Sequence, residues 1–550
     1  MRVLGIEGTA WAASAAVYDE STEDVAIETE AYRPESGGIH PREAAEHMRE
    51  AIPAVVERAL ADADGPIDAV AFSRGPGLGP CLRIAGTAAR SLAQTLDVPL
   101  VGVNHMVAHL EIGRHQSGFE SPVCLNASGA NAHVLGYRNG RYRVLGETMD
   151  TGVGNAIDKF TRHVGWSHPG GPKVEAAAKE GDYVELPYVV KGMDFSFSGI
   201  MSAAKQAYDD GAAVEDVSAG LQETIFAMLA EVTERALSLT GRDELVLGGG
   251  VAQNERLQAM LREMTRQRGA ALYVPEARFL RDNAGMIAVL GAKMARAGDT
   301  LSIEDSAIDA DFRPDQVPVT WRSGESVDAY RTGDGVIEGA EATVSFEDGT
   351  VIKTRRAKSY RHPALDERLR RERTVQEARL THEARTLGVP TPVISDVDLA
   401  EARILFERVG ETDLRNAITE SRVAEVGGHL ARIHEAGFVH GDPTTRNVRV
   451  RAGSAMDMAG EGSQVAAQAT QPDGRDGRPP ETILIDFGLG YYTDDVEDYA
   501  MDLHVLAQSL SGTADDPEAL SAAAEERYAT VGDPSVIERL REIEGRGRYQ

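Results

Sequence analysis

His105-Met106-Val107-Ala108-His109 follows an apolar, strand-like run at residues 98–103. On a helix, residues four positions apart lie on one face, about a turn apart. Two imidazoles on that face can hold one metal ion. The alternative is a pair of histidines that only pack or hydrogen-bond on a helix face. Further ligands elsewhere in the chain would therefore favour a metal site.

The composition is that of a globular protein with an unusual charge. Of 550 residues, 42% are hydrophobic and 26% charged, and the length suffices for roughly three or four domain-sized units. The net charge of −30 argues against a simple nucleic-acid-binding surface. Cys81 and Cys124 suggest no disulfide framework, which fits a reducing compartment. The N-terminal apolar run is too short for a signal peptide, and no run reaches the roughly 18 apolar residues of a spanning helix. We therefore expect a cytoplasmic protein without a membrane anchor.

Strands and helices alternate as far as residue 110, which predicts an α/β fold with a layered sheet. Residues 3–9 read as a strand that runs into a tight turn, and residues 12–18 as the returning strand. An acidic residue, glycine and threonine at such a turn are typical of the opening hairpin of actin-like and sugar-kinase ATPases. A second strand at residues 69–73 leads into a glycine-rich stretch, where the backbone can approach a ligand closely.

Glycine-rich turns with polar residues follow the later strands. The run from Asn126 to Ala130 ends a strand, and its backbone N–H groups can cradle an anionic or carbonyl oxygen. Asp158 and Glu175 lie beside glycine-rich turns, where they either accept bonds from sugar hydroxyls or are solvated surface acids. Three glycines end another strand before Asn254, so a nucleobase or ribose can lie against bare backbone there.

A third candidate metal ligand is Asp282, at the start of a predicted helix. Its carboxylate is either an N-cap, worth about 1 kcal/mol, or the oxygen ligand that joins His105 and His109. The second interpretation predicts that these distant parts of the sequence converge on one ion.

Taken together and in this order, these motifs resemble the archaeal and eukaryotic tRNA threonylcarbamoyladenosine transferases of the KEOPS complex, over roughly residues 1–322. The resemblance implies an actin-like (ASKHA) fold of two duplicated α/β lobes. It also implies one divalent metal, iron or zinc, held by His105, His109 and Asp282. The family commonly has a tyrosine ligand where this chain has Asn126, so the fourth metal position is an amide oxygen, water or substrate. The positions implied to bind threonylcarbamoyl-AMP are Asn126, Ala127, Ser128, Gly129, Ala130, Asp158, Gly171, Glu175 and Asn254.

The implied reaction is consistent with these residues. Its donor is a mixed anhydride of a carbamate and AMP. Its acceptor is the exocyclic amine of the adenosine 3′ of the anticodon, in tRNAs that read codons beginning with A. A metal can act as a Lewis acid on a carbamoyl or phosphate oxygen, and backbone N–H groups can stabilise the developing oxyanion. A metallopeptidase is the alternative, but a zincin helix has Glu beside its first His, and that position here is Met106.

A second set of motifs lies in the last part of the chain. Lys353 ends an apolar strand, Asn447 follows Asp442 by five residues, and Asp486 opens an Asp-Phe-Gly triplet after another strand. These motifs in this order are typical of protein kinases. In kinases the residue matching Asp442 is the catalytic proton acceptor, and those matching Asn447 and Asp486 hold magnesium.

This part resembles the small atypical serine/threonine kinase of the same KEOPS complex, over residues 333–550, after a polar linker at 323–332. The resemblance implies a small bilobal domain that binds ATP and Mg and whose ATPase activity supports the transferase. Gly441 replaces the usual arginine and no activation segment fits after Gly488, so a peptide substrate would lack its platform. Residues 453–480 read as a disordered surface insertion. The positions implied to bind ATP are Ile337, Glu338, Gly339, Ala340, Glu341, Ala342, Thr343, Val344, Lys353 and its ion-pair partner Glu377.

One dense basic run stands out in this acidic chain. It is either a helix face that pairs with neighbouring acids or a contact for tRNA phosphates. Its members are Arg355, Arg356, Lys358, Arg361, Arg368, Arg370, Arg371 and Arg373, and Arg546 and Arg548 lie on the C-terminal tail.

The sequence as a whole predicts a bifunctional enzyme of haloarchaeal type, a natural fusion of a tRNA threonylcarbamoyltransferase with its ATPase or kinase partner. Its expected partners are tRNA, threonylcarbamoyl-AMP, ATP and the other small KEOPS subunits. The rival hypothesis is a nucleotide-binding scaffold that organises partner subunits with one or both sites inactive.

The net charge of −30 predicts that the fold requires salt. The Debye length falls from about 10 Å at 0.1 M salt to about 3 Å at 1 M, so salt removes most of the self-repulsion. We expect the thermal unfolding midpoint to rise between low and multimolar KCl, as measured by circular dichroism. Equal folding of the purified chain at both salt concentrations would contradict this prediction.

Overall fold

The computed structural model describes residues 1–32, 40–138, 140–322, 336–347, 349–451 and 481–546. The predicted linker at 323–332, the predicted insertion at 453–480 and Arg548 lie outside these residues. Among the helices described, none is both long enough and apolar enough to cross a membrane.

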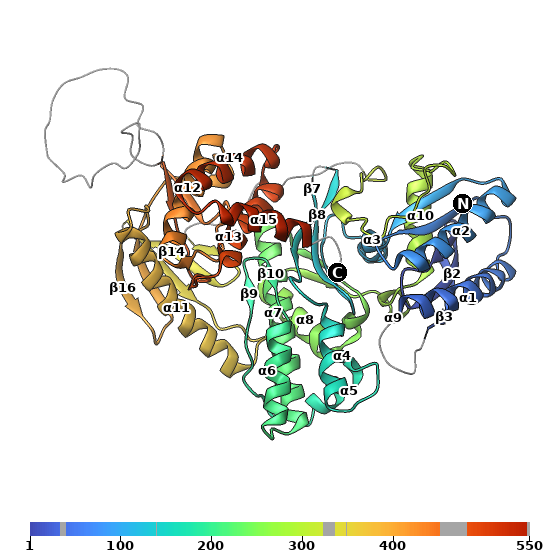
Figure 1. The fold of residues 1–550 in the computed structure, drawn as a ribbon, viewed down its shortest axis with the longest axis horizontal. Helices are drawn as coiled ribbons and strands as arrows, with labels where there is room; N and C mark the ends of the chain where they lie inside the picture. Colours follow the sequence, from blue (N-terminus) through green and yellow to red (C-terminus); the bar gives the residue numbers. More distant parts are fainter. Residues whose placement is uncertain (33–39, 139, 323–335, 348, 452–480, 547–550) are drawn as a thin grey trace, which may run out of the picture.

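Two five-stranded sheets of the same topology form the N-terminal segment, residues 1–322 (Figure 1). The strand orders are β3-β2-β1-β4-β5 and, from the matching edge, β8-β7-β6-β11-β12. In each sheet the central strand pairs antiparallel on one side and parallel on the other. This repeat confirms the predicted α/β class and duplicated lobes. The strands are β1 (Arg2–Glu7), β2 (Ala12–Asp19), β3 (Asp24–Ala31), β4 (Ala69–Gly75), β5 (Leu100–Asn104), β6 (Val123–Ala127), β7 (Ala132–Arg138), β8 (Arg141–Glu147), β11 (Glu244–Gly248) and β12 (Ala271–Tyr273), with a short hairpin of β9 (Val190–Lys191) and β10 (Asp194–Phe195).

Helices cover both faces of these sheets. α1 and α2 pack on the outer face of the first sheet, α10 packs on its inner face, and α3 contacts strands of both sheets. The side chains of α3 are buried from His105 to Gly113, as expected for a helix between two sheets. A Cβ at Gly113 would lie 2.2 Å from Val246 Cγ1, so glycine lets α3 approach β11. The helices are α1 (Pro41–Ala61), α2 (Gly79–Leu96), α3 (His105–Ser117), α4 (Val153–His163), α5 (Gly171–Ala178), α6 (Ser198–Asp209), α7 (Val214–Thr240), α8 (Glu255–Arg268), α9 (Ala277–Leu280) and α10 (Ala284–Arg296), with 3₁₀ turns η1 (Gly250–Gln253) and η2 (Pro314–Gln316).

The C-terminal segment, residues 336–546, has its own antiparallel sheet in the order β13-β14-β15-β17-β16 and a separate helical core. Lys353 lies on β15, where Val344 and Ile404 are its neighbours across the sheet. The strands are β13 (Val336–Glu338), β14 (Ala342–Glu347), β15 (Thr350–Arg355), β16 (Ile394–Asp398), β17 (Arg403–Glu407), β18 (Thr412–Asp413), β19 (Phe438–Val439), β20 (Val448–Val450), β21 (Thr482–Leu484) and β22 (Tyr491–Tyr492). The helices are α11 (Pro363–Thr386), α12 (Glu420–Glu435), α13 (Val496–Thr513), α14 (Pro517–Val531) and α15 (Ser535–Arg546), with a 3₁₀ turn η3 (Leu414–Asn416).

The two segments meet along α7, β9 and β10 on one side and α11 and α13 on the other (Figure 1). Lys191 of β9 pairs with Asp498 of α13, and Glu231 of α7 pairs with Arg361 and Arg373 around α11. Most charges of the dense basic run pair with acids, either across this contact or within the C-terminal segment. The pairs are Arg355–Glu377, Lys358–Glu234, Arg361–Glu231, Arg368–Glu185, Arg370–Asp366 and Arg373–Glu231. The structure therefore confirms pairing with neighbouring acids for these residues, and the tRNA-contact hypothesis stays a prediction for the exposed Arg371.

Candidate functional site

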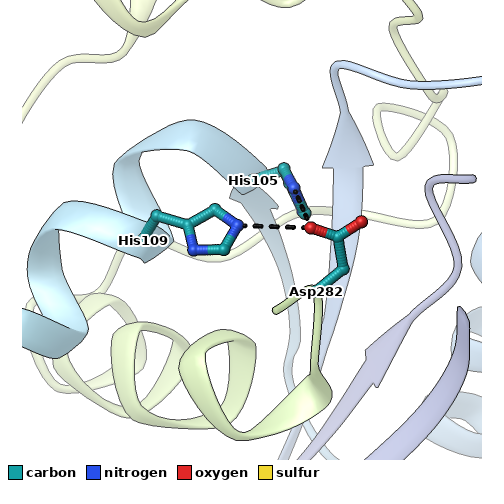
Figure 2. Close-up of side chains that lie close together, drawn as sticks. All are labelled: His105, His109 and Asp282. Atoms are coloured by element: carbon teal, nitrogen blue, oxygen red, sulfur yellow. Dashed lines mark hydrogen bonds and ion pairs between the residues drawn. The ribbon is translucent and has the colours of Figure 1, made fainter. Parts of the chain in front are cut away.

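Helix α3 places two imidazoles side by side. Asn104 caps the helix, because its side-chain oxygen accepts from the backbone N–H groups of Met106 and Val107 at 3.0 and 3.1 Å. His105 and His109 project from the first two turns of α3, with ring centroids 4.8 Å apart and ring planes at 88° (Figure 2). Both side chains are buried.

Asp282 faces the two imidazoles from the stretch before α10 (Figure 2). Its Oδ1 lies 3.2 Å from His105 Nε2 and 3.3 Å from His109 Nε2. The N-cap interpretation of Asp282 is wrong, because Asn283 caps α10 by accepting from the Met286 N–H at 3.1 Å. The carboxylate of Asp282 is therefore directed at the histidine pair.

The three side chains fit a divalent transition metal. Their ligand atoms all lie within 4.8 Å of one another, and two tetrahedral ligands about 2.1 Å from one ion would be about 3.4 Å apart. Two imidazole nitrogens and one carboxylate oxygen are a donor set that zinc and iron accept. Asn126 Oδ1 is buried without a hydrogen-bond partner among the described residues, which leaves it available as an oxygen ligand.

The pKa values in the cluster favour a proton on His105, between the carboxylates of Glu7 and Asp282. Burial lowers the pKa of His105, but Glu7 and Asp282 outweigh burial and raise that pKa to about 10. Burial lowers the pKa of His109. For Asp282, burial is outweighed by the neighbouring His105, so the pKa of its carboxyl is held below its usual value. A cation among these groups can therefore replace the proton.

Glu7 contacts the candidate metal centre, although the sequence showed it only as part of a turn. Its Oε2 lies 3.1 Å from His105 Nδ1, and its side chain has no exposed surface. Ser73 donates to Glu7 Oε2, and Thr9 donates to Oε1 through its N–H at 2.7 Å and its hydroxyl at 2.5 Å. With Nδ1 facing a carboxylate, His105 presents Nε2 to Asp282 and to any metal.

The run from Asn126 to Ala130 lies at the end of β6 and turns beside α4. The Asn155 N–H donates to Gly129 O at 2.9 Å, so the turn is fixed against the start of that helix. A Cβ at Gly249, where φ is +87°, would lie 2.3 Å from Ala127 O. The glycine at the end of β11 is therefore required for the close approach of these two strand ends.

Two of the other residues predicted to contact the adenylate, Asp158 and Glu175, each accept a hydrogen bond from a nearby backbone N–H group. Asp158 Oδ1 accepts from the Gly170 N–H at 2.7 Å, which fixes the turn before Gly171. Glu175 Oε1 accepts from the Glu255 N–H at 2.9 Å, next to Asn254, which caps α8. Asp158 and Glu175 thus hold the backbone next to Gly171 and next to Asn254, and the role of these residues in ligand binding stays a prediction.

In the C-terminal segment, the structure brings together the charged residues that the motifs predicted. Lys353 Nζ lies 2.7 Å from Glu377 Oε1 and 2.8 Å from Asp486 Oδ1. The Asn447 amide donates to Asp442 Oδ2 at 2.9 Å and to Asp442 O at 2.8 Å. Burial raises the pKa of Asp442 to about 7, partly opposed by Arg235 of the N-terminal segment.

Asp502 supports this site, although the sequence did not identify it. Its carboxylate accepts from the backbone N–H groups of His440 and Gly441 at 2.7 and 2.8 Å and from His434 Nε2 at 3.0 Å. It therefore fixes the loop that carries Asp442. The only sequence signal was its place in a helix soon after the Asp-Phe-Gly triplet.

Comparisons with known proteins identify the family. Residues 21–289 match the family model of TsaD, tRNA N6-adenosine threonylcarbamoyltransferase. The chain is 68% identical over its full length, and over the full length of the relative, to a protein of Haloarcula marismortui. That relative is named a probable bifunctional tRNA threonylcarbamoyladenosine biosynthesis protein. This chain belongs to the family of bifunctional tRNA threonylcarbamoyladenosine biosynthesis proteins.

Other members of this family bear the same name and match the whole chain. The relative in Halobacterium salinarum is 67% identical over 100% of this chain and 99% of its own. The relative in Methanospirillum hungatei is 48% identical with the same coverage. Among solved structures, full-length HypF in a phosphate- and nucleotide-bound form has a TM-score of 0.39 at 14% identity, over 53% of this chain and 55% of that chain.

Removal of one ligand from the candidate metal centre should lower the bound metal in this family member. We expect His109→Ala and Asp282→Ala to lose most of the iron or zinc measured by mass spectrometry of the purified protein. Glu7→Gln should weaken metal affinity by about 10- to 100-fold, because it loosens the orientation of His105. His163→Ala, at an exposed His–Asp pair elsewhere, is the matched control. Full metal content in His109→Ala and Asp282→Ala would contradict the assignment.

Proposed function

We propose that residues 1–322 transfer the threonylcarbamoyl group from threonylcarbamoyl-AMP to the exocyclic amine of the adenosine 3′ of the anticodon, in tRNAs that read codons beginning with A. The observation that carries this proposal is the convergence of His105, His109 and Asp282 in a chain that matches its named relatives from end to end. The proposed boundaries are 1–322 for the transferase domain, 323–332 for the linker and 333–550 for the second domain.

The transferase residues divide into metal ligands and adenylate contacts. His105, His109 and Asp282 would hold iron or zinc, with Asn126 as an oxygen donor beside them. The metal, when bound, supplies Lewis-acid polarisation of a carbamoyl or phosphate oxygen. Backbone N–H groups of the turn from Ser128 to Ala130 would stabilise the oxyanion that develops.

The remaining predicted contacts would position the adenylate. Asp158, Glu175 and Asn254 would orient the ribose and base on the rim formed by α4, α5 and α8. Gly171 and the glycines after β11 would leave the space that the nucleotide needs. Orientation of the two reactants then lowers the barrier to transfer.

We propose further that residues 333–550 form an atypical kinase-like ATPase domain. The β13–β14 turn, residues 337–344, would cover the nucleotide, and Lys353 would pair with its phosphates while Glu377 positions the lysine. Asp486 and Asn447 would hold Mg, and Asp442 would accept the proton of the attacking group. Only two residues separate Gly488 from β22, which pairs with β19. This short connection supports a domain without an activation segment and hence hydrolysis rather than protein phosphorylation.

We extend the proposal to the cellular setting. We propose a cytoplasmic enzyme of a salt-adapted cell that works on tRNA together with the other small KEOPS subunits. The scaffold hypothesis is less well supported, because Lys353, Glu377 and Asp486 form a contiguous charged site. The metallopeptidase hypothesis is less well supported, because the buried Met106 occupies the position of the zincin glutamate.

Mass spectrometry of tRNA nucleosides tests the two roles together. We expect His109→Ala to abolish the threonylcarbamoyl modification, because the metal centre loses a ligand. Asp486→Ala should leave single-turnover transfer intact and reduce multiple turnover, because only the ATPase site is damaged. Wild-type levels of the modification in His109→Ala would refute the transferase role of this site. Casein cleavage that is lost with His105→Ala would favour the peptidase.

The pH dependence of ATP hydrolysis tests Asp442. Its carboxyl must be ionised to accept a proton, and its pKa is raised to about 7. The ATPase rate of the full chain should therefore rise with pH around neutrality and level off above it. Asp442→Asn should lower the rate by about 100-fold or more and remove this dependence. A flat profile in the wild type would rule out Asp442 as the base.

A further inference from the structure

A buried side chain of α7 contacts Asn254, the N-cap of α8 and one of the residues proposed to bind the adenylate. Gln222 is 6% exposed, and its Oε1 accepts a hydrogen bond from Asn254 Nδ2 at 3.1 Å. We propose that Gln222 is a positioning residue of the transferase, which orients the amide of Asn254 so that its second N–H can bind the nucleoside part of the adenylate. This inference rests on the proposed function of residues 1–322.

The hydrogen bonds around Asn254 fix which atom of its amide faces Gln222. The Oδ1 position of Asn254 accepts from the backbone N–H groups of Arg256 and Leu257 at 2.9 and 3.2 Å, so this atom is the oxygen that caps α8. A flipped amide would place its NH₂ group against these two donors. The atom that faces Gln222 Oε1 is therefore the nitrogen.

The amide nitrogen of Asn254 has one donor to spare. An asparagine nitrogen carries two N–H groups, and within the described ranges its one acceptor is Gln222 Oε1. Because the amide group is planar, a bond to one N–H also sets the direction of the other. Adenylates offer suitable acceptors in their ribose hydroxyls and ring nitrogens. Gln222 would thus act on the nucleotide through Asn254.

The space next to Asn254 suits a nucleotide that lies against backbone. Asn254 ends the 3₁₀ turn η1, which begins at Gly250 after β11. A Cβ at Gly250 would meet no atom within 4 Å, and the same is true at Gly129 and Gly171, two other positions predicted to bind the adenylate. Backbone without side chains and open space at these three glycines support a ligand site beside the amide that Gln222 holds.

Gln222 is not the only contact that joins α7 to the start of α8. The neighbouring Glu223 forms a bidentate pair with Arg256, with Oε1 2.5 Å from Nε and Oε2 2.7 Å from Nη2. This ion pair connects the two helices without a contact to Asn254. A purely structural role for Gln222 should therefore be reproduced by substitution of Glu223, whereas a positioning role should not.

Helix α7 is a rigid base for this contact. Its side chains are buried from Val217 to Ser238, apart from Glu223. Glu231, further along the helix, pairs with two arginines of the C-terminal segment. A side chain on a helix that is packed in this way holds a functional group more precisely than one on a loop.

Steady-state transfer to tRNA by the full chain at constant high KCl tests the inference, through kcat and KM for threonylcarbamoyl-AMP. Gln222→Met keeps the length of the side chain and removes the acceptor. It should raise KM about three- to tenfold, which corresponds to one hydrogen bond, and leave kcat within about twofold. Gln222→Asn, which is shorter by one methylene and stays polar, should do the same. Both variants should keep the metal content of the wild type, because neither changes a metal ligand.

Asn254→Asp isolates the donor, because aspartate still caps a helix but has no amide N–H. It should raise KM at least as much as Gln222→Met does. The double variant should show no further increase, because both changes act on the same N–H. Glu223→Gln is the matched control at the same helix junction and should keep the KM of the wild type.

The inference is overturned if Gln222→Met and Gln222→Asn both keep the KM of the wild type. It is also overturned if Glu223→Gln raises KM equally, or if Gln222→Met raises KM as much in the Asn254→Asp background as in the wild type. A wild-type KM in Asn254→Asp would remove the adenylate role of Asn254, and this inference with it, while the transferase function stands. Absence of transfer by the wild type would refute the proposed function itself, together with this inference.

Discussion

One oxygen atom, Oδ1 of Asp282, faces two imidazole nitrogens at 3.2 and 3.3 Å, and the fold of the N-terminal segment serves to bring these atoms together. His105 and His109 begin a helix that follows the last strand of the first sheet. Asp282 precedes α10, which packs on that same sheet after the chain has built the second sheet. The duplicated topology therefore has to be complete before the three ligands can meet.

Glu231 connects the two segments through buried ion pairs with three arginines. It is buried on α7 and accepts from Arg235 at 2.5 Å, Arg361 at 2.5 Å and Arg373 at 2.9 Å. Burial opposes its charge, but Arg373 and the other two arginines outweigh burial and hold the pKa of Glu231 below its usual value. Loss of one partner from a buried ion pair commonly costs about 3–5 kcal/mol. This carboxylate thus fixes α11, and with it Glu377, relative to the transferase segment.

Local patterns were sufficient to predict several parts of the structure. The His-x-x-x-His spacing placed both imidazoles on one helix face, and the order of Lys353, Asp442 and Asp486 identified the second charged site. The contacts of Glu7, Asp502 and Glu231 could not be predicted from the sequence, because each contact joins residues that are far apart in the chain. A single buried glutamate on a strand or helix has no spacing pattern that reveals its partner. For the same reason, the sequence alone did not decide whether Asp282 is a metal ligand or an N-cap. The structure excludes the N-cap, because Asn283 caps α10.

The ion pairs between α7 and α11 belong to a single polypeptide, and this has a consequence for assembly. Association within one chain depends on an effective concentration set by the tether, not on the amounts of two separate proteins. The contact is therefore insensitive to dilution, and its two halves are always made in equal numbers. Buried pairs are also screened by salt much less than exposed ones. Buried ion pairs within one chain can therefore persist at salt concentrations at which two separately synthesised subunits would dissociate.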